Sequence, residues 1–489
     1  MRRKLTMEQY TKQYINGTWK LGSSEKTIEN FNPYTGEKIV TIQSANKKDL
    51  DEAFQAAKEA QPTWANMTVA EKQGHFQKLI AVMVAEKDTI VDWLIKESGS
   101  THLKATIEFD SALAIVRESM SFITRLAGRI LPSNFPNKEN RIYRLPKGVI
   151  GVIGPWNFPF HLTMRSVAPA LATGNSVVIK PASDTPITSG LLFGVLFEKA
   201  GFPQGLVNVV VGKGSEIGDE FVIHPIPKLI SFTGSTEVGR RIGENAGRNL
   251  KDVALELGGN NVMIVLKDAN IEQAAKAAVF GKFLHQGQIC MALNRIIVDK
   301  EVHDEFVNEF VKLVGGLKYG DPSDPSTFVG PVINKEQVER IQKDLKHSIE
   351  QGAELIYGGK VEGNLMQPTV LKNVTNNMSI AQNEIFGPVA AIIKADNENE
   401  AIEFANDSPY GLSGSIFTED RHHGVQLAMK IETGMIHVND QSVNDEAHVS
   451  FGGEKESGIG RFNGEWAMDK FTTVKWIGVQ SGYRDYPML

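Results

Sequence analysis

Apolar residues recur along this chain at two different spacings. From about residue 50 to residue 129, glycines are few and apolar positions recur at helical intervals, which predicts a run of helices. From residue 148 on, short β-branched runs alternate with longer segments of helical periodicity, which predicts an α/β fold whose parallel sheet carries helices on both faces. The predicted strands are 148–154, 176–180, 206–211, 229–233 and 253–257, with helices following the first strand up to residue 172 and covering 186–200.

A second α/β unit is predicted to begin after the pair Gly258-Gly259. Residues 262–266 predict another strand, and Asn270 with Gln273 resembles a capping box at the start of a helix. This helix ends near residue 286, and Cys290 follows shortly after it. We therefore expect Cys290 on a loop and not inside a core element.

Two further segments fit neither unit. Residues 141–145 alternate polar and apolar side chains, and residues 471–479 have similar strand character near the C-terminus. They could form a peripheral hairpin and a tail, or strands that extend a sheet into a partner subunit. We favour the second interpretation.

The composition is that of a soluble globular protein. A chain of 489 residues is too long for one core, so two or three packed units are expected. The net charge of −6 and the pI of about 6.1 give no reason to expect nucleic acid or an anionic membrane as a partner. No apolar run suits a signal peptide or a membrane span, which predicts a cytoplasmic location.

Cys290 is the one cysteine of the chain. An intramolecular disulfide and a site with several thiolate ligands are thereby excluded, and no metal site is predicted. A lone cysteine is most often a small buried hydrophobic residue. Its neighbourhood must decide whether it is reactive.

The candidate chemistry lies where the predicted strands end, because parallel sheets bind ligands at the carboxyl ends of their strands. The first strand leads to Asn157, the second to Lys180 and the fourth to a loop that begins with Gly234 and opens a helix. A helix N-terminus offers free N–H groups to a pyrophosphate, although a strand–helix turn with two glycines is a weak signal alone. Asn157 could cap the following helix or donate its amide to an oxyanion.

Glu256 stands in an otherwise apolar strand, just before the Gly-Gly pair. It could point to solvent or form a salt bridge. If it faces a cleft instead, desolvation should raise its pKa toward the range that suits a general base.

Taken in order, these motifs resemble those of the aldehyde dehydrogenase superfamily over nearly the whole chain, from residue 31 to residue 475. The resemblance rests on the segments Pro155-Trp156-Asn157-Phe158-Pro159, Lys180-Pro181-Ala182-Ser183, Gly234–Gly239, Glu256-Leu257-Gly258-Gly259, Gln286-Gly287-Gln288-Ile289-Cys290, Glu384-Ile385-Phe386-Gly387-Pro388 and Phe451-Gly452-Gly453. It implies that Cys290 is a nucleophile that attacks an aldehyde carbon, that Asn157 and the backbone N–H of Cys290 hold the oxyanion, and that Glu256 is the general base that activates water.

The resemblance also implies a nicotinamide cofactor, NAD or NADP, and a set of residues that bind it. Lys180 would contact the adenosine ribose and Glu384 the nicotinamide ribose, while the other members line the pyrophosphate or pack beside the ring. That set is Lys180, Ser183, Gly234, Ser235, Glu384, Phe386 and Trp156.

The family architecture implies three parts and an assembly. A Rossmann-like cofactor-binding domain would span residues 1–127 and 147–257, and a catalytic domain residues 258–455. Residues 128–146 and 470–489 would form a small β oligomerisation element, so a homodimer or homotetramer is expected.

Several positions depart from the common pattern or leave the substrate open. Ser183 stands where many NAD-selective members carry a glutamate, which predicts use of both NAD⁺ and NADP⁺, and His285 is expected to be a packing residue. Segments 160–165 and 437–448 are similar to benzaldehyde- and vanillin-type dehydrogenases, so an aromatic aldehyde is predicted. Arg165 could instead hold the carboxylate of succinate semialdehyde, or form an ion pair. The sequence also leaves open a CoA-acylating enzyme and an inactive structural relative.

Overall fold

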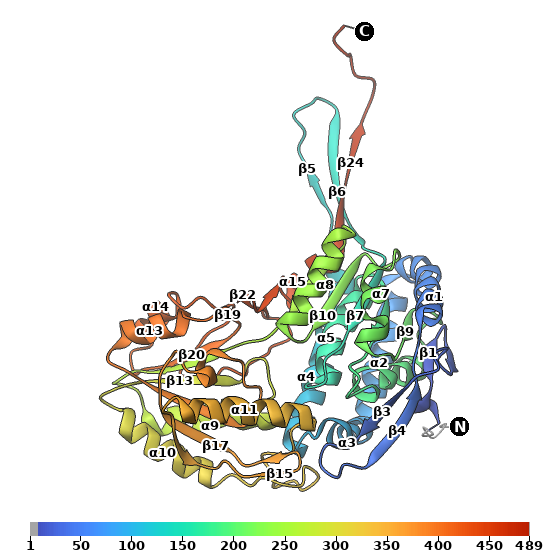
Figure 1. The fold of residues 1–489 in the computed structure, drawn as a ribbon. Coiled ribbons are helices and arrows are strands. Elements are labelled where there is room, and N and C mark those ends of the chain that lie inside the picture. Colours follow the sequence, from blue (N-terminus) through green and yellow to red (C-terminus); the bar gives the residue numbers. More distant parts are fainter. Residues whose placement is uncertain (1–7, 489) are drawn as a thin grey trace.

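Figure 1 shows a computed structural model that describes residues 8–488. The chain forms two lobes, each built on a sheet, and a narrow three-stranded sheet that projects away from one of them. The blue and green segments build the lobe on the right of the view, and the yellow and orange segments build the lobe on the left.

The first lobe contains an eight-stranded sheet in the order β2-β1-β9-β8-β7-β10-β11-β23. The five strands from β9 to β11 run parallel, and β1 and β23 join the two edges antiparallel. The bounds are β1 Gln13–Ile15, β2 Thr18–Lys20, β7 Val149–Ile153, β8 Ser176–Lys180, β9 Val207–Val209, β10 Leu229–Thr233, β11 Asp252–Glu256 and β23 Gly458–Ile459.

Helices cover both faces of this sheet, as the sequence pattern predicts. Side chains alternate between two cores along the buried strands: Val149 packs with α1, α7 and α8 on one face, while Ile150 packs with α2 to α6 on the other. The bounds are α1 Lys47–Ala65, α2 Val69–Ala85, α3 Lys87–Ser98, α4 His102–Arg125, α5 Pro159–Ala172, α6 Leu192–Lys199, α7 Asp219–Ile223 and α8 Thr236–Arg248.

The helix predicted over 186–200 is shorter and begins differently. Residues Ile187–Leu191 form a π-helical turn, and α6 starts only at Leu192. The buried carboxylate of Glu97 accepts the N–H groups of Ile187 at 2.9 Å and Thr188 at 2.7 Å. The Glu97 carboxylate, which comes from α3, therefore satisfies the first backbone N–H groups of this segment, as a capping residue does at the start of an ordinary helix.

The second lobe contains a seven-stranded sheet in the order β14-β17-β18-β13-β12-β20-β21, parallel except for β14 at one edge. Helices α9 and α10 cover one face, and α11, α13 and α14 cover the other. The bounds are β12 Asn261–Val265, α9 Ile271–Phe283, β13 Leu293–Asp299, α10 His303–Gly315, α11 Lys335–Glu350, β14 Glu354–Tyr357, β17 Thr369–Val374, β18 Val389–Ala395, α13 Glu398–Asn406, β20 Gly414–Phe417, α14 Arg421–Ala428 and β21 His437–Val438.

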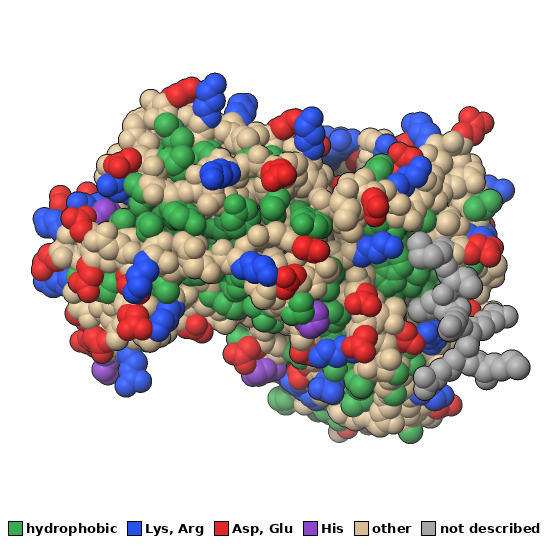
Figure 2. All heavy atoms as spheres, turned by 90° about the horizontal axis from the view of Figure 1, so that it is seen from below, with side chains coloured by type: hydrophobic (Ala, Val, Ile, Leu, Met, Phe, Trp, Pro, Cys, Tyr) green, Lys and Arg blue, Asp and Glu red, His purple; other side chains and the backbone are tan. Residues whose placement is uncertain are grey.

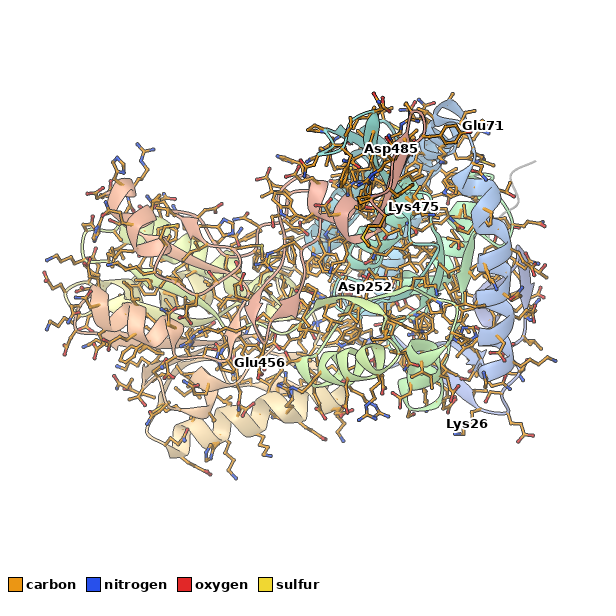
Figure 3. All side chains as sticks on the ribbon, turned by 90° about the horizontal axis from the view of Figure 1, so that it is seen from above. Lys26, Glu71, Asp252, Glu456, Lys475 and Asp485 are labelled. Carbon is orange, nitrogen blue, oxygen red and sulfur yellow. The ribbon has the colours of Figure 1, made fainter. Side chains whose placement is uncertain are left out.

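The two orphan segments of the sequence pair with each other. Strand β24 (Thr472–Gln480) runs antiparallel to β6 (Lys138–Pro146), which also pairs with β5 (Arg129–Leu131). The resulting sheet projects from the first lobe in Figure 1, and Figure 3 places Lys475 and Asp485 on that side of the molecule. Several of its apolar side chains are exposed, including Val474 at 62% and Trp476 at 64%.

The remaining surface is mixed in charge. On the face shown in Figure 2, positive and negative side chains are interspersed, with hydrophobic side chains between them. Within residues 8–488, the helices are all too short or too polar to span a bilayer.

Candidate active site

The predicted site residues of the first lobe lie at one edge of its sheet. Lys180, the last residue of β8, is level with Ile153 at the end of β7, and Glu256, the last residue of β11, is level with Thr233 at the end of β10. Because these strands are parallel and adjacent, their carboxyl ends form one continuous edge. Besides Lys180 and Glu256 at the strand ends themselves, the segments that follow these strands carry Trp156 and Asn157, Ser183, and Gly234 and Ser235.

The loop that bears Cys290 has an unusual backbone. After α9, His285 and Gln286 adopt left-handed conformations, with φ of 50° and 58°. Such conformations cost about 1–3 kcal/mol each and persist only where surrounding contacts impose them. The Gln286 side chain supplies such contacts: its Nε2 donates to the carbonyl of Pro331 at 2.8 Å, and its Oε1 accepts the N–H of Gly330 at 3.0 Å.

The start of β12 holds the other side of this loop. The Asn261 side chain donates to the carbonyl oxygens of Cys290 at 2.7 Å and Ala292 at 2.9 Å. Gly259 lies so close that a Cβ atom there would approach the Cys290 carbonyl oxygen to 2.4 Å. A glycine is therefore required at 259, and the loop is fixed beside the end of β11, where Glu256 lies.

The Cys290 side chain is buried in this position, with 7% of the residue exposed. Burial raises the pKa of its thiol well above the usual value, and the charge of Glu256 raises it further, whereas Arg165 opposes the shift. The thiol is therefore protonated at neutral pH and needs a base before it can react as a thiolate.

The nearby carboxylate of Glu256 is suited to this task. Only 1% of the residue is exposed, and the Cys290 thiol lies within reach of the Glu256 carboxylate. Burial raises its pKa to about 7, against the lowering effect of Arg165, and Asp445 adds to the rise. Glu256 thus points inward, unlike the solvent-exposed alternative, and can accept a proton near neutral pH.

Asn157 does not cap the following helix. Phe158 is the N-cap residue of α5 and makes no side-chain cap, while the Asn157 amide reaches across to the loop that bears Cys290. Its Nδ2 donates to the carbonyl oxygen of Gln288 at 3.0 Å. The structure thus brings Asn157, Glu256 and Cys290 together from two lobes.

A buried ion pair that sequence analysis missed holds Asn157 in place. The Lys104 ammonium donates to the Asn157 carbonyl at 2.7 Å, to Ser100 Oγ at 2.9 Å and to Glu108 Oε2, and both members of the pair are fully buried. Glu108 Oε1 accepts the N–H groups of Phe160 at 2.9 Å and His161 at 3.2 Å, at the start of α5.

The three ammonium protons of Lys104 therefore each have an acceptor, as a buried charge requires. The only signal in the sequence is a lysine and a glutamate four residues apart in a helix, which is typical of an exposed pair.

The predicted cofactor residues of the first lobe include a buried cation with one long hydrogen bond. Lys180 is buried, and the only acceptor near its ammonium among the described residues is the carbonyl of Pro181 at 3.4 Å. Burial lowers the pKa of Lys180 to about 8. Gly234 donates its N–H to the Glu256 carbonyl at 3.0 Å, and Ser235 is the N-cap residue of α8.

The second lobe brings two more of the predicted cofactor residues, Glu384 and Phe386, to the same edge. Glu384 Oε1 accepts the N–H of Gly259 at 3.0 Å, and burial raises the pKa of Glu384 to about 7. Phe386 has a φ of 51°, and its ring stands edge-on to Trp156 with 5.3 Å between centroids. Glu384 and Phe386 therefore face the ends of β7 and β11 across the junction of the lobes.

The sequence left the role of Arg165 open and predicted a packing role for His285. Both residues are fully buried. The Arg165 guanidinium lies 3.7 Å from Glu256 Oε2 and 3.5 Å from Asp445 Oδ2, measured from its Nη2 and Nη1 atoms. The His285 ring packs edge-on against Phe158 at 5.6 Å, in agreement with a packing role.

A cavity of about 460 Å³ opens next to this group. Ile107 and Ile115 of α4 line one wall, and His161 of α5 with Asp445 and Glu446 of the loop over 439–450 lines another. Because Asp445 is also the neighbour of Arg165, the cavity lies close to the buried carboxylate of Glu256.

The model of the aldehyde dehydrogenase family matches residues 19–477 of this sequence. The chain belongs to the aldehyde dehydrogenase family. Among the curated relatives of this aldehyde dehydrogenase, a vanillin dehydrogenase of Corynebacterium glutamicum is 52% identical, over 96% of this chain and 98% of the relative. A benzaldehyde dehydrogenase of Bacillus subtilis is 48% identical, over 98% of this chain and 99% of the relative.

Solved structures of other family members have the same fold. An NAD-dependent benzaldehyde dehydrogenase from Corynebacterium glutamicum has a TM-score of 0.90 and 48% identity, over 98% of this chain and 99% of the other. A betaine aldehyde dehydrogenase from Staphylococcus aureus, solved in complex with NAD⁺, has a TM-score of 0.95 and 32% identity, over 98% and 97%. The predicted α/β fold and the predicted family are thus confirmed.

Proposed function

We propose that this aldehyde dehydrogenase oxidises aromatic aldehydes to carboxylic acids, with NAD⁺ or NADP⁺ as hydride acceptor. The observation that carries the proposal is the convergence of a buried thiol, a buried carboxylate with a raised pKa and a side-chain amide at Cys290, Glu256 and Asn157. Water and the aldehyde are consumed, and the acid, the reduced cofactor and a proton are released.

The reaction begins at the sulfur of Cys290. Glu256 takes the thiol proton, directly or through water, and the thiolate attacks the aldehyde carbon. The carbonyl π electrons move to oxygen, so that a negative charge develops on the oxygen of a tetrahedral carbon bonded to sulfur. The Asn157 amide donates to this oxygen, with the backbone N–H of Cys290 as the second donor.

A nicotinamide bound beside Cys290 would supply the hydride acceptor. Once the hydride has left, Cys290 holds the former aldehyde carbon as the acyl carbon of a thioester. Glu256 releases the thiol proton to solvent and then removes a proton from water, which attacks the thioester. The acid leaves, and this second proton passes from Glu256 to the sulfur to restore the thiol. A base with a pKa of about 7 is half deprotonated at neutral pH, which suits both proton transfers.

The residues at the sheet edge fit a dinucleotide. The ammonium of Lys180, whose one acceptor among the described residues is the Pro181 carbonyl, would donate to the hydroxyls of the adenosine ribose. Gly234 and Ser235, at the start of α8, would lie against the pyrophosphate. Glu384 would accept hydrogen bonds from the nicotinamide ribose, with Phe386 and Trp156 beside the ring. The neutral hydroxyl of Ser183 leaves room for the 2′-phosphate of NADP⁺.

An aromatic substrate is supported by the names of the relatives and by the surroundings of Cys290. Ile289 and Met291 flank the nucleophile and are buried, and an apolar wall of this kind suits a ring. Succinate semialdehyde is disfavoured because Arg165 already faces the carboxylates of Glu256 and Asp445. The acidic side chains of Asp445 and Glu446 in the cavity wall would also repel a substrate carboxylate.

A CoA-acylating enzyme and an inactive relative have less support. A CoA-acylating enzyme has no need of a general base for water, and here the base is present at Glu256. An inactive relative would be expected to have lost the nucleophile or the cofactor loop, and both are present.

The domain assignment stays a prediction: a cofactor-binding unit of residues 1–127 and 147–257, and a catalytic unit of residues 258–455. A homodimer or homotetramer that forms through the projecting sheet, and a cytoplasmic location, are likewise predictions.

The proposal is tested by assaying benzaldehyde, vanillin and succinate semialdehyde with each cofactor and identifying the product. We expect free aromatic acid in amounts equal to the reduced cofactor, and higher kcat/KM for the aromatic aldehydes. A higher kcat/KM for succinate semialdehyde would contradict the substrate class, and formation of acyl-CoA in place of the acid when CoA is added would contradict hydrolysis.

A further inference from the structure

Arg165 lies between two carboxylates at the centre of the molecule. We propose that Arg165 is a positioning residue that, balanced between Glu256 and Asp445, sets the pH at which Glu256 becomes competent to hydrolyse the thioester. This inference rests on the proposed general-base role of Glu256.

The guanidinium is enclosed and held without hydrogen bonds. Arg165 is buried, and among the described residues its three side-chain nitrogens have no hydrogen-bond partner. The Phe451 and Phe462 rings lie 4.1 Å and 4.8 Å from its Cζ atom, so aromatic faces take the place of solvent around the cation. A buried cation requires a compensating negative charge.

Two anions supply that charge from different parts of the chain. The separations of 3.7 Å to Glu256 and 3.5 Å to Asp445 exceed those of a charge-assisted hydrogen bond, which are about 2.7–2.9 Å. The guanidinium is therefore not committed to either carboxylate. Since water does not screen the group, its charge acts strongly on both.

Asp445 is the more firmly held of the two. His161 Nε2 lies 2.8 Å from Asp445 Oδ2, and Asn463 Nδ2 donates to Asp445 Oδ1 at 2.6 Å. Burial acts to raise the pKa of Asp445, but His161, Arg165 and Asn463 together lower it by more, so that the pKa lies below the usual value. Asp445 is thus a permanent anion at neutral pH, whereas Glu256 titrates.

Four groups face the Glu256 carboxylate from the elements packed against it. Arg165 comes from α5, Cys290 from the nucleophile loop, Asp445 from the loop over 439–450 and Glu384 from the loop before β18. Arg165 is the one cation of this set. It stabilises the ionised form of Glu256, and Asp445 partly cancels that effect.

Two substitutions should therefore shift the titration of Glu256 in opposite directions. Arg165→Met removes the cation, so protonated Glu256 persists to higher pH. Asp445→Asn keeps the shape and removes the competing anion, so Glu256 ionises at lower pH. General damage to the fold would not produce shifts of opposite sign.

The experiment measures thioester hydrolysis alone, in the full-length protein and without cofactor. An activated aryl ester acylates Cys290, excess ester is removed at low pH, and the loss of the acyl group after a jump to each pH is followed by intact mass. The variants are Arg165→Met, Asp445→Asn and the charge-conserving Arg165→Lys, with thermal unfolding of each as the record of folding.

We expect the wild-type rate to rise through a pH near 7, the pKa of Glu256. The midpoint should move up by about one pH unit in Arg165→Met, which is the lower end of the pKa shift that a neighbouring charge causes. It should move down in Asp445→Asn. In Arg165→Lys, which keeps the positive charge, it should return toward the wild-type value. Midpoints that stay within about 0.2 units, or that move in the same direction, would overturn the inference. If Arg165→Met does not fold, Asp445→Asn decides the test: a downward shift of its midpoint supports the inference, and no shift or an upward shift overturns it.

Glu256→Gln separates this inference from the function on which it rests. If that variant hydrolyses the thioester at the wild-type rate, the proposed role of Glu256 fails. If it blocks hydrolysis while the midpoints of the other variants do not move, only the role of Arg165 fails.

Discussion

The side-chain amide of Asn157 donates to the carbonyl oxygen of Gln288 at 3.0 Å, two residues before the nucleophile. This contact joins the sheet edge of one lobe to the Cys290 loop of the other. It fixes the position of the Asn157 amide before any substrate arrives, and in the proposed mechanism such preorganisation is the main source of the effect of an oxyanion donor.

Replacing Asn157 with Ala should therefore lower kcat about 10²–10³-fold, the usual effect of losing one oxyanion donor. Steady-state kinetics with benzaldehyde measure this, and the alkylation rate of Cys290 shows whether the thiol is still intact. Asn397→Ala, which removes only the cap of α13, is the matched control and should leave kcat unchanged. A loss of less than about threefold in Asn157→Ala would exclude the oxyanion role.

The buried Lys104–Glu108 pair should be essential for stability. Glu108→Gln leaves the Lys104 charge unpaired and should cost about 3–5 kcal/mol in the free energy of unfolding. It should also lower kcat, because the start of α5 and Asn157 lose their support. Denaturant unfolding and kinetics measure the two effects.

The control for this pair is the exposed pair of Glu272 and Lys276, which has the same four-residue spacing. Glu272→Gln should change stability by less than about 0.5 kcal/mol. Equal effects in the two variants would mean that the Lys104–Glu108 pair is no more important than a surface pair.

Ser183 should decide whether the enzyme tolerates the 2′-phosphate of NADP⁺. The wild-type protein should use both cofactors, with a kcat/KM ratio below about 100-fold, or about 2.7 kcal/mol. Ser183→Glu should selectively lower kcat/KM for NADP⁺ by charge repulsion, whereas Ser183→Ala should preserve both activities. Strict NAD⁺ preference in the wild type would refute this account of position 183.

The exposed apolar residues of the projecting sheet should be covered in the assembled enzyme. Val474→Asp should shift the protein to a smaller species in light scattering after size-exclusion chromatography, because a buried unpaired charge opposes association. Leu250→Asp places the same charge at a residue that is 96% exposed outside this sheet and should leave the mass unchanged. A wild-type monomer would remove the basis of this prediction.

The bounds of helices and strands were predicted best where the apolar pattern and the residues that flank it indicated the same end point. Residues 176–180 and 229–233 are strands with those same bounds in the structure, since continuous apolar runs there end in Lys180 and in the Gly234 loop. The predicted strand 206–211 is shorter, at Val207–Val209. The start of the predicted helix at 186 depends on Glu97, a partner far away in sequence that periodicity does not reveal.

Site residues that belong to sequence motifs could be predicted. Residues whose burial and charge partners come from distant parts of the chain could not. The strand ends predicted that Asn157, Lys180 and the Gly234 loop share an edge, and the family resemblance added Glu256 and Cys290. The setting of Arg165 could not be predicted, because its rings and its second carboxylate come from residues 445–462, far later in the chain. Lys104 and Glu108 were missed because burial alone distinguishes them from a surface pair.

The central claim is that Cys290 carries the acyl group and that Glu256 directs water to it. The most direct measurement is the intact mass of Glu256→Gln after mixing with benzaldehyde and cofactor, followed by peptide mapping. Because Glu256→Gln lacks the base that takes the thiol proton as well as the base that directs water, we predict slow accumulation of a benzoyl group on Cys290. It should reach one per chain and form together with one equivalent of reduced cofactor. An unmodified Cys290 in protein that has reduced the cofactor, or full turnover by a Cys290→Ala variant, would contradict the account.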